Sequence, residues 1–289
     1  MKELESDLVP YDGSFRVGRA PARPPKDAPD EKECRRRLEK SVARISEMQE
    51  ILYAHDSHAL LLIFQGMDAS GKDGTIRAVL SGVNPAGCQV FSFKTPSPEE
   101  LDHDFLWRTT RCLPGRGRIG VFNRSHYEEV LVVRVHPEYL ERQNLPAPLR
   151  LHKLWDKRFE SIRSHERHLA RQGTVILKFW LNVSKQEQRR RFVSRLEDPA
   201  KMWKYSEADV AERRHWREYM KAYEDALRHT SRPWAPWYAI PADDKPYMRM
   251  RVAAIVAGAM ERLRLKRPAP DAAQRASLAR MRKLLDAEP

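Results

Sequence analysis

The feature that most restricts the fold of this chain is a glycine-rich loop between an apolar segment and a helical pattern. Residues 60–64 (LLLIF) are bulky and apolar, as a buried strand of a parallel sheet requires, and residues 66–74 (GMDASGKDG) follow one position later. Apolar side chains then recur at helical spacing from residue 75 to residue 80. In this order the loop is typical of a phosphate-binding P-loop, because its N–H groups converge on an anion and its lysine reaches the outer oxygens. The structural alternative is a glycine-rich strand-to-helix turn that holds no ligand.

Two carboxylates make this P-loop unusual. The common form has Ser or Thr directly after the lysine, where its hydroxyl holds Mg²⁺. This chain has Asp73 at that position, and Asp68 lies inside the loop. Carboxylates repel phosphates unless a cation lies between them. The loop therefore predicts phosphate chemistry that depends on a metal ion.

The rest of the chain alternates between strand and helix patterns. Such alternation predicts an α/β fold with a parallel sheet covered on both faces, whose ligands lie at the carboxyl ends of the strands. A long amphipathic helix is predicted over 31–55. Further strands are predicted at 89–93, 119–123, 174–181 and 237–240, with helices at about 98–112, 125–135, 147–171, 184–196, 206–229 and 246–264.

The chain divides into three parts. Residues 1–30 hold several prolines and no sustained periodicity, which predicts an extended arm or a poorly ordered tail outside the catalytic core. Residues 31–267 are expected to form a single P-loop domain, with a lid at about 184–209. Residues 268–289 end in a short basic helix, which suits packing or contacts between subunits.

Composition restricts the location and the partners. No apolar run approaches the roughly 18 residues that span a bilayer, and the first residues lack a signal pattern, so we expect a cytoplasmic protein without membrane contact. The three cysteines are scattered, and we expect them to be reduced. With 53 basic and 40 acidic residues the net charge is +13, which favours a polyanionic partner such as nucleic acid, a nucleotide or another phosphate polymer. Solvated helix surfaces are the alternative explanation of this charge.

Polar residues come at the end of the strand predicted at 119–123 and directly after it. A P-loop enzyme commonly ends this second strand in an Asp that holds Mg²⁺. Here Asn123 stands in that place, so a metal carboxylate must come from elsewhere, and Asp68 and Glu128 are the candidates. Arg124 is expected to point at the phosphates. The alternative is ordinary capping of a helix N-terminus.

An arginine-rich helix is predicted at 184–196. Phe192 belongs to an apolar edge of this helix, and Arg191 and Arg195 lie on the adjacent face. Arginines carried by a lid can neutralise the charge of a phosphoryl group during its transfer. A merely solvated basic helix is the alternative. Residues 206–209 (SEAD) then match a capping box, which predicts where the next helix begins.

Four stretches together resemble the family-2 polyphosphate kinases, in the thymidylate-kinase-like branch of P-loop proteins. They are residues 66–74, residues 93–96 (FKTP), residues 122–128 (FNRSHYE) and the arginine-rich segment that leads to residues 203–204 (WK). The resemblance runs from about residue 31 to residue 265. It implies a three-layer P-loop kinase fold, in which helices flank a parallel five-stranded sheet and a helical lid covers the site.

The resemblance also implies a reaction. Family members transfer a terminal phosphoryl group reversibly between inorganic polyphosphate and a nucleotide, with Mg²⁺ or, as a substitute, Mn²⁺. Adenine and guanine nucleotides would be the partners, and the protein would form a homotetramer or a homodimer. A linear polyanion in a cleft lined by Lys and Arg would be attracted electrostatically, and its binding would weaken with salt. Nucleic acid is not an expected partner.

Site residues follow from the resemblance by matching position. Asp68 and Asp73 would organise the metal and the acceptor, and the metal ligands would be Asp68 and Glu128. An acceptor phosphate is already ionised near neutral pH, so Asp68 would orient it rather than accept a proton. The implied catalytic residues are Asp68, Lys72, Asp73, Asn123, Arg124, Glu128, Arg191 and Arg195. The implied phosphate-binding residues are Gly66, Met67, Ala69, Ser70, Gly71, Gly74, Lys94, Arg190 and Lys204.

Residues 123–129 are similar to the subgroup known as class III, which phosphorylates both nucleoside mono- and diphosphates, AMP to ADP and ADP to ATP. That subgroup commonly has Asp where this chain has Glu129. The extra methylene moves the carboxylate by about a bond length, so the balance between AMP and ADP as acceptors is left open by the sequence.

Two other functions stay open. An ATP-dependent nucleoside monophosphate kinase would share the fold, but it would have Ser or Thr after Lys72. A non-enzymatic nucleic-acid-binding protein would explain the charge, but it has no need of carboxylates that face the polyanion.

Overall fold

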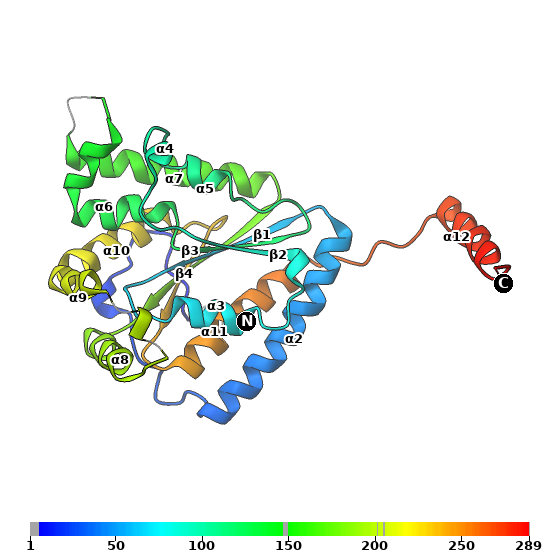
Figure 1. Cartoon of the computed structure of the whole chain (residues 1–289), viewed down its shortest axis with the longest axis horizontal. Helices are drawn as coiled ribbons and strands as arrows, with labels where there is room; N and C mark the ends of the chain where they lie inside the picture. Colours follow the sequence, from blue (N-terminus) through cyan, green and yellow to red (C-terminus); the bar gives the residue numbers. More distant parts are fainter. Residues whose placement is uncertain (1–5, 147–149, 201, 205, 289) are drawn as a thin grey trace.

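A parallel sheet lies at the centre of the computed structural model, which describes residues 6–146, 150–200, 202–204 and 206–288 (Figure 1). Within these residues the sheet has five strands in the order β2-β3-β1-β4-β5, and every neighbouring pair is parallel. This arrangement confirms the predicted α/β fold. The strands are β1 (Ala59–Gln65), β2 (Cys88–Ser92), β3 (Ile119–Asn123), β4 (Thr174–Asn182) and β5 (Trp237–Pro241).

The three central strands, β3, β1 and β4, are the most apolar because they are covered on both faces. All residues of β1 are buried, whereas β2 at one edge of the sheet leaves most of its side chains at least partly exposed. In Figure 1 one group of helices lies below the sheet and another above it. The lower layer is α2 (Glu31–His55), α3 (Lys72–Val79) and α11 (Lys245–Arg262), and the upper layer includes α6 (Val132–Val135), α7 (Leu151–Arg171) and α10 (Trp216–Thr230).

Three predicted helices are wrong in that they are broken into shorter ones. The helix predicted at 98–112 is α4 (Pro98–Leu101) and α5 (Trp107–Thr110), because the carboxylate of Asp104 accepts a bond from the N–H of Leu106 and turns the chain between them. The helix predicted at 125–135 is η3 (His126–Val130) and α6. The helix predicted at 206–229 is α9 (Glu207–Glu212), η6 (Arg213–His215) and α10.

Two helix starts also differ from expectation. Ser206 is the N-cap of α9, but its side chain makes no capping hydrogen bond, so the predicted capping box is wrong. The helix predicted at 147–171 begins at Leu151, and residues 147–149 lie outside the described residues. The remaining elements are η1 (Val17–Arg19), η2 (Pro85–Gly87), η4 (Pro137–Gln143), α8 (Lys185–Glu197), η5 (Met202–Lys204) and α12 (Ala272–Leu285).

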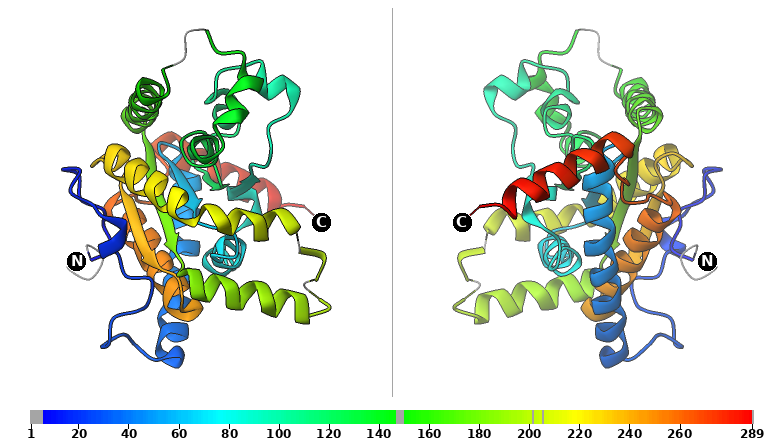
Figure 2. Two further views of the ribbon diagram at one scale, coloured as in Figure 1. Left: turned by 90° about the vertical axis from the view of Figure 1, so that its left-hand side faces the viewer. Right: turned by 90° about the vertical axis from the view of Figure 1, so that its right-hand side faces the viewer.

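The N-terminal arm packs along the free edge of β5 (Figure 2). Leu8 forms an antiparallel bridge with Tyr238, and Val9 is fully buried in the main hydrophobic core. The carboxylate of Asp7 accepts a bond of 2.7 Å from Nε of Arg251, and both side chains are buried. An edge strand otherwise exposes unpaired N–H and C=O groups, so the arm satisfies part of this edge. Leu8 and Val9 therefore contribute to the core, which proline content alone did not predict.

The C-terminal helix α12 lies away from the sheet (Figure 1). Its N-cap Asp271 and Gln274 form a capping box, and none of its described residues is buried. Among the described residues, no helix is both long and apolar enough to cross a membrane.

Candidate active site

The P-loop joins the carboxyl end of β1 to α3. Gly66 and Gly71 both have positive φ, and a Cβ on Gly66 would lie 2.9 Å from the carbonyl oxygen of Leu181. A Cβ on Gly71 would lie 2.9 Å from Cε of Met248. Only glycine fits both places without displacing the neighbouring strand or helix. The loop is thus held in a single narrow bend, with the N-terminus of α3 at its end.

Lys72 is the first residue of α3 and its ammonium lies inside the loop. Nζ donates a hydrogen bond of 2.7 Å to the carbonyl oxygen of Gly66, and only 9% of the residue is exposed. Burial lowers the pKa of Lys72, and the nearby charge of Arg124 lowers it further, while Asp68 and Glu128 oppose this. An anionic ligand at this ammonium would therefore stabilise its charged form.

The end of β3 and the turn after it bring three predicted residues to the loop, Asn123, Arg124 and Glu128. Arg124 has a φ of 63°, an uncommon conformation for a residue with a side chain, and such strain is typical of functional sites. Its Nη2 donates a bond of 2.6 Å to Oδ1 of Asp68, and its Nη1 lies 3.9 Å from Oε2 of Glu128. Nδ2 of Asn123 donates a bond of 2.6 Å to Oδ1 of Asp73. Carboxylates from the loop and polar groups from β3 are therefore in direct contact.

The charges of this cluster shift one another. Burial raises the pKa of Glu128, although Arg124 and Lys72 oppose the shift. Burial opposes the charge of the Arg124 guanidinium, but Glu128 and Asp68 outweigh it and keep its pKa above the ordinary value. Titratable groups with shifted pKa values that meet at a loop are typical of catalytic sites.

Arg191 of α8 lies behind the P-loop rather than in front of it. Its Nη1 donates to the carbonyl oxygens of Ala69 and Ser70, at 3.0 and 2.8 Å. Its Nη2 donates to the carbonyl oxygens of Ala242 and Asp243, and its Nε donates to Glu187. All the N–H groups of this guanidinium are therefore used within the chain. In this structure Arg191 binds the carbonyl oxygens of the loop, and the phosphate clamp that we expected of it stays a prediction.

The other residues of α8 behave differently from one another. Arg190 is exposed and makes a bidentate pair with Glu187. Arg195 is partly exposed, with Nη1 4.0 Å from Oδ2 of Asp209, and its guanidinium lies over the ring of Phe192. In Figure 2 α8 and the segment that begins with α9 extend beyond the sheet as two neighbouring arms. Arg195 therefore makes fewer contacts within the described part of the chain than Arg191 does, and its expected role at the phosphates stays a prediction.

The remaining predicted residues lie at the borders of this region. Met67 and Ala69 are nearly buried within the loop, and Gly74 is in the first turn of α3. Lys94 is exposed after β2, and its carbonyl oxygen accepts a bond from Arg108. Lys204 lies in η5, and its side chain is outside the described part of the structure.

One residue that touches the loop was not predicted. The side chain of Gln188 is buried and Nε2 donates a bond of 2.8 Å to the carbonyl oxygen of Asp68. Its Oε1 accepts a bond of 2.5 Å from Arg213. Gln188 has charged neighbours in the sequence, as an exposed residue of a helix commonly has. Its contact with the loop therefore becomes evident only from its burial in the fold.

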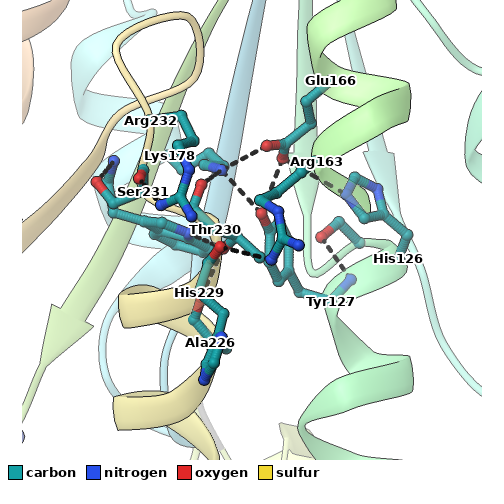
Figure 3. Close-up of polar contacts among 12 residues, drawn as sticks. His126, Tyr127, Arg163, Glu166, Lys178, Ala226, His229, Thr230, Ser231 and Arg232 are labelled. Carbon is teal, nitrogen blue, oxygen red and sulfur yellow. Dashed lines mark hydrogen bonds and ion pairs between the residues drawn. The ribbon is translucent and has the colours of Figure 1, made fainter. Parts of the chain in front are cut away.

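A buried ionic network lies beneath η3, which carries Glu128 (Figure 3). Nζ of Lys178 is 2.6 Å from Oε2 of Glu166, and both side chains are almost completely buried. Lys178 also donates to the hydroxyl of Tyr127 at 2.8 Å and to the carbonyl oxygen of Thr230 at 2.9 Å. The Tyr127 hydroxyl in turn donates to Glu166 at 2.8 Å. In the sequence, the signal for this network is Lys178, the one charged residue of the apolar β4, because a buried lysine needs an acidic partner.

The oxygen groups of the site suit a small hard cation. Among the described residues, no group of three or more His, Cys, Asp or Glu side chains is arranged to hold a metal. Asp68 and Glu128 both face the guanidinium of Arg124, at 2.6 and 3.9 Å, so the two carboxylates already lie around one positive charge. Mg²⁺ commonly takes one or two carboxylates and keeps waters and phosphate oxygens as its other ligands. The two carboxylates therefore fit a divalent cation whose other ligands would be waters and phosphate oxygens.

Comparisons with known proteins identify the family. The family model "Polyphosphate kinase 2 (PPK2)" matches residues 28–268. The chain is 56% identical over 249 residues to the ADP-polyphosphate phosphotransferase of Rhodopseudomonas palustris, which covers 86% of both chains. It is 46% identical over 230 residues to the AMP/ADP-polyphosphate phosphotransferase of Meiothermus ruber, covering 80% of this chain and 82% of that one.

A solved structure agrees with these relatives. The crystal structure of polyphosphate kinase 2 from Arthrobacter aurescens matches with a TM-score of 0.84 and 38% identity, and it covers 92% of this chain and 93% of that chain. The match extends beyond the P-loop to nearly the whole described fold. The protein is therefore a phosphotransferase that belongs to the polyphosphate kinase 2 family.

Proposed function

We propose that this enzyme transfers phosphoryl groups between inorganic polyphosphate and nucleoside mono- and diphosphates, from AMP to ADP and from ADP to ATP, reversibly and with Mg²⁺. The observation that carries the proposal is the contact between Arg124 and Asp68 at the mouth of a P-loop that has Asp73 in place of Ser or Thr. Polyphosphate is named as a substrate of both quoted relatives. The same names support a nucleotide as the second substrate.

Different residues of the site bind the phosphoryl group that is transferred and the phosphates on either side of it. The loop N–H groups and Lys72 bind the phosphoryl group that is transferred, and their positive ends stabilise the charge that spreads over its oxygens. Arg124 and Arg195 neutralise the phosphates on either side of it. The attacking oxygen belongs to a phosphate that is already ionised, so orientation rather than proton removal is required.

Asp68 and Glu128 would hold the metal ion. When bound, Mg²⁺ would neutralise phosphate oxygens and allow two polyanions to approach each other. Asn123 keeps Asp73 oriented toward the same place through its hydrogen bond of 2.6 Å. Mn²⁺ has similar oxygen preferences and is expected to substitute.

Glu129 bears on the choice of acceptor. Its side chain is buried, accepts a bond of 2.8 Å from Gln143 and lies 3.2 Å from Nη1 of Arg158. These residues line a cavity of about 120 Å³ together with Phe105 and Arg108. Because Arg158 and Gln143 already hold the carboxylate, we propose that Glu129 shapes this wall and that both AMP and ADP are used.

The test is a set of reactions with the purified full-length protein, Mg²⁺ and long-chain polyphosphate, with AMP or ADP added separately and ATP left out. Chromatography of the nucleotides over time should show ADP from AMP and ATP from ADP. Product from only one acceptor would contradict the dual range and would direct attention to a Glu129→Asp variant. No product from either acceptor, with AMP phosphorylated once ATP is added, would show an ATP-dependent nucleotide kinase instead.

A Lys72→Ala variant tests the alternative that the protein binds polyanions without catalysing a reaction. Catalysis should collapse in this variant while binding of polyphosphate weakens only modestly, because the other cations remain. A uniform loss of polyphosphate binding in this variant, with no activity in the wild type to lose, would instead support a polyanion-binding protein.

A further inference from the structure

Two consecutive residues, Glu212 and Arg213, contact different parts of the fold. Glu212 is the last residue of α9, and Arg213 is the first residue of η6. Glu212 contacts the helical layer above the sheet, whereas Arg213 contacts α8. In Figure 2 the segment that begins with α9 runs beside α8. The junction between α9 and η6 therefore connects the α8 arm with the body of the domain.

The carboxylate of Glu212 binds two side chains of the upper layer. Its Oε2 accepts a hydrogen bond of 2.6 Å from the hydroxyl of Tyr219 on α10 and lies 3.0 Å from Nε2 of His136, which follows α6. Nδ1 of the same imidazole lies 3.1 Å from Oε1 of Glu138 in η4. A protonated imidazole donates from both nitrogens, so it can bind both carboxylates at once. Glu212 is thus fixed from two elements of this layer.

The surroundings of His136 favour its charged form. Burial opposes the charge of the ring, but Glu212 and then Glu138 outweigh it and raise the pKa of His136 above its ordinary value of 6.5. The rings of Tyr139 and His215 also face the imidazole, with centroids 5.4 and 5.0 Å away. The ion pair with Glu212 is therefore complete at acidic pH and weakens as the pH rises through the raised pKa of His136.

Arg213 reaches the P-loop through Gln188 of α8. Its Nη1 donates a hydrogen bond of 2.5 Å to Oε1 of Gln188 and one of 3.2 Å to the carbonyl oxygen of Lys185. Nε2 of Gln188 in turn donates a bond of 2.8 Å to the carbonyl oxygen of Asp68. The buried amide accepts at one end and donates at the other, which fixes its orientation. A continuous series of contacts therefore runs from the upper layer, through Glu212 and Arg213, to the backbone of Asp68.

Helix α9 also carries a charge beside the site. Asp209 lies one turn before Glu212, and its Oδ2 is 4.0 Å from Nη1 of Arg195. Burial raises the pKa of Asp209 and the charge of Asp68 adds to the shift, while Arg124 opposes it. The carboxylate of Asp209 is therefore close enough to the loop for these charges to act on it. The contacts of Glu212 set the position of α9, and so the position of Asp209 relative to Arg195.

We propose that Glu212 and Arg213 are positioning residues for phosphoryl transfer. Glu212, anchored by His136, fixes α9, and Arg213 fixes α8 and the middle of the P-loop through Gln188. Neither residue contacts a phosphate. The inference rests on the proposed function, because it assumes that the P-loop and the lid act on the phosphoryl group.

Loss of Arg213 should lower the rate more than the affinity. We expect Arg213→Ala to lower kcat for ADP by roughly tenfold or more, because small displacements of reacting groups are costly in the transition state. The KM values for ADP and polyphosphate should change by less than about twofold, since the groups that bind them remain. Arg213→Lys keeps a donor for Gln188 and should restore much of kcat.

A double-mutant cycle tests whether the two residues act together. Glu212→Gln alone should also lower kcat, because the charged contact with His136 is lost. If both residues act through one series of contacts, the double variant with Glu212→Gln and Arg213→Ala should lose less kcat than the product of the single losses. Losses that multiply would show that the two residues act independently.

The dependence on pH tests the part played by His136. The ratio of wild-type kcat to that of Glu212→Gln should be largest at acidic pH and should fall as the pH rises through the raised pKa of His136. Taking the ratio cancels the titration of groups that both proteins share. A ratio that is constant or rises with pH would contradict the anchoring of Glu212 by a charged imidazole.

Glu138→Gln is the matched control. Glu138 contacts the other nitrogen of His136, but it is exposed and belongs to η4 rather than to α9. Its loss removes a carboxylate from the same imidazole without touching the contacts between α9, α8 and the loop. We expect kcat of Glu138→Gln to stay within about twofold of the wild type.

Hydrogen exchange supplies a measurement that does not depend on activity. The backbone N–H groups of residues 66–71 should exchange faster in Arg213→Ala than in the wild type, and at the wild-type rate in Glu138→Gln. Thermal unfolding of both variants should stay near the wild-type temperature, since the contacts that they lose are partly exposed.

The outcomes separate the two proposals. A wild-type protein without polyphosphate activity would overturn the proposed function, and the exchange rates of the loop would still test the positioning role. An active wild type whose Arg213→Ala variant keeps both kcat and the exchange rates of the loop would overturn the positioning role and leave the proposed function intact.

Discussion

Nη2 of Arg124 lies 2.6 Å from Oδ1 of Asp68, and this contact joins the end of β3 to the middle of the P-loop. The two residues are far apart in the sequence, and they follow the neighbouring strands β1 and β3 of the sheet. Because both strands end at the same edge, the arginine and the carboxylate meet where phosphate would bind. The contact orients both groups before any substrate arrives. When substrate and metal bind, Arg124 would contact phosphate oxygens and Asp68 would contact the metal ion.

Replacing Asp68 should change how the rate of the reaction depends on the Mg²⁺ concentration. We expect Asp68→Asn to lower kcat by about a hundredfold or more and to raise the Mg²⁺ concentration needed for half-maximal rate, because an amide is a weaker ligand without charge. Chelation of Mg²⁺ in the wild type should abolish activity, and added Mn²⁺ should restore it. The check is the rate as a function of Mg²⁺ for both proteins. An unchanged Mg²⁺ dependence in Asp68→Asn would show that the carboxylate does not bind the metal.

Arg191 and Arg190 provide a matched pair on one helix. Arg191→Ala would leave buried carbonyl oxygens of the loop without donors, and we expect a loss of about 3 kcal/mol or more in the free energy of unfolding. The exposed Arg190→Ala should leave the free energy of unfolding nearly unchanged. Urea unfolding of both variants tests this difference. If Arg191→Ala kept full stability but lost activity, the side chain would instead act on a phosphate.

The buried pair of Lys178 and Glu166 should couple strongly. Either Lys178→Met or Glu166→Gln alone leaves a charged group buried without its partner and should cost about 3–5 kcal/mol. The double variant, with Lys178→Met and Glu166→Gln together, should cost less than the sum of the single variants, because no charge is then left buried without a partner. A double-mutant cycle measured by urea unfolding supplies the coupling, and additive effects would count against the pair.

Glu128 should set an acidic limit to activity. Burial raises its pKa above the ordinary 4.5, although Arg124 and Lys72 oppose the shift, so the carboxylate becomes ionised only above that pH. We expect kcat/KM to fall as the pH drops through this raised pKa, and Glu128→Gln to remove the limb together with most of the activity. The pH profile of kcat/KM in both proteins is the measurement.

The raised pKa of Glu128 has the opposite effect on stability, which falls rather than rises as the pH increases. The folded state of a raised carboxyl binds more protons than the unfolded state between the two pKa values, so stability falls as the pH rises through that interval. Glu128→Gln should therefore make the protein more stable at neutral pH while making it less active. A less stable variant at neutral pH would show that the ionised form of Glu128 supports the fold.

Local patterns were sufficient to predict the frame of the site. The strands near residues 60–64, 119–123 and 174–181 were predicted because buried parallel strands are continuous apolar runs. The P-loop was predicted because its glycines and Lys72 stand next to one another in the chain. Both signals lie within a few residues, so no knowledge of distant contacts was needed.

The roles of single side chains depended on distant partners. Arg191 and Arg195 occupy the same face of one predicted helix, yet one holds the loop carbonyls and the other stays partly exposed. Lys178 is the one charged residue of β4, and its partners Glu166 and Tyr127 come from elements that only the fold places beside this strand. The sequence shows which side chains are charged and which can form hydrogen bonds. Packing in the folded chain decides which partner each of these side chains contacts.

The sequence by itself determined the class of fold, the phosphate loop and the chemical types of its side chains, because these follow from local periodicity and spacing. Only the tertiary structure decided that Asp68 meets Arg124, that Val9 of the arm enters the core and that Arg249 faces Gly74. Each of these contacts joins segments separated by many residues, and its energy depends on a distance and a burial that exist only after the chain has folded.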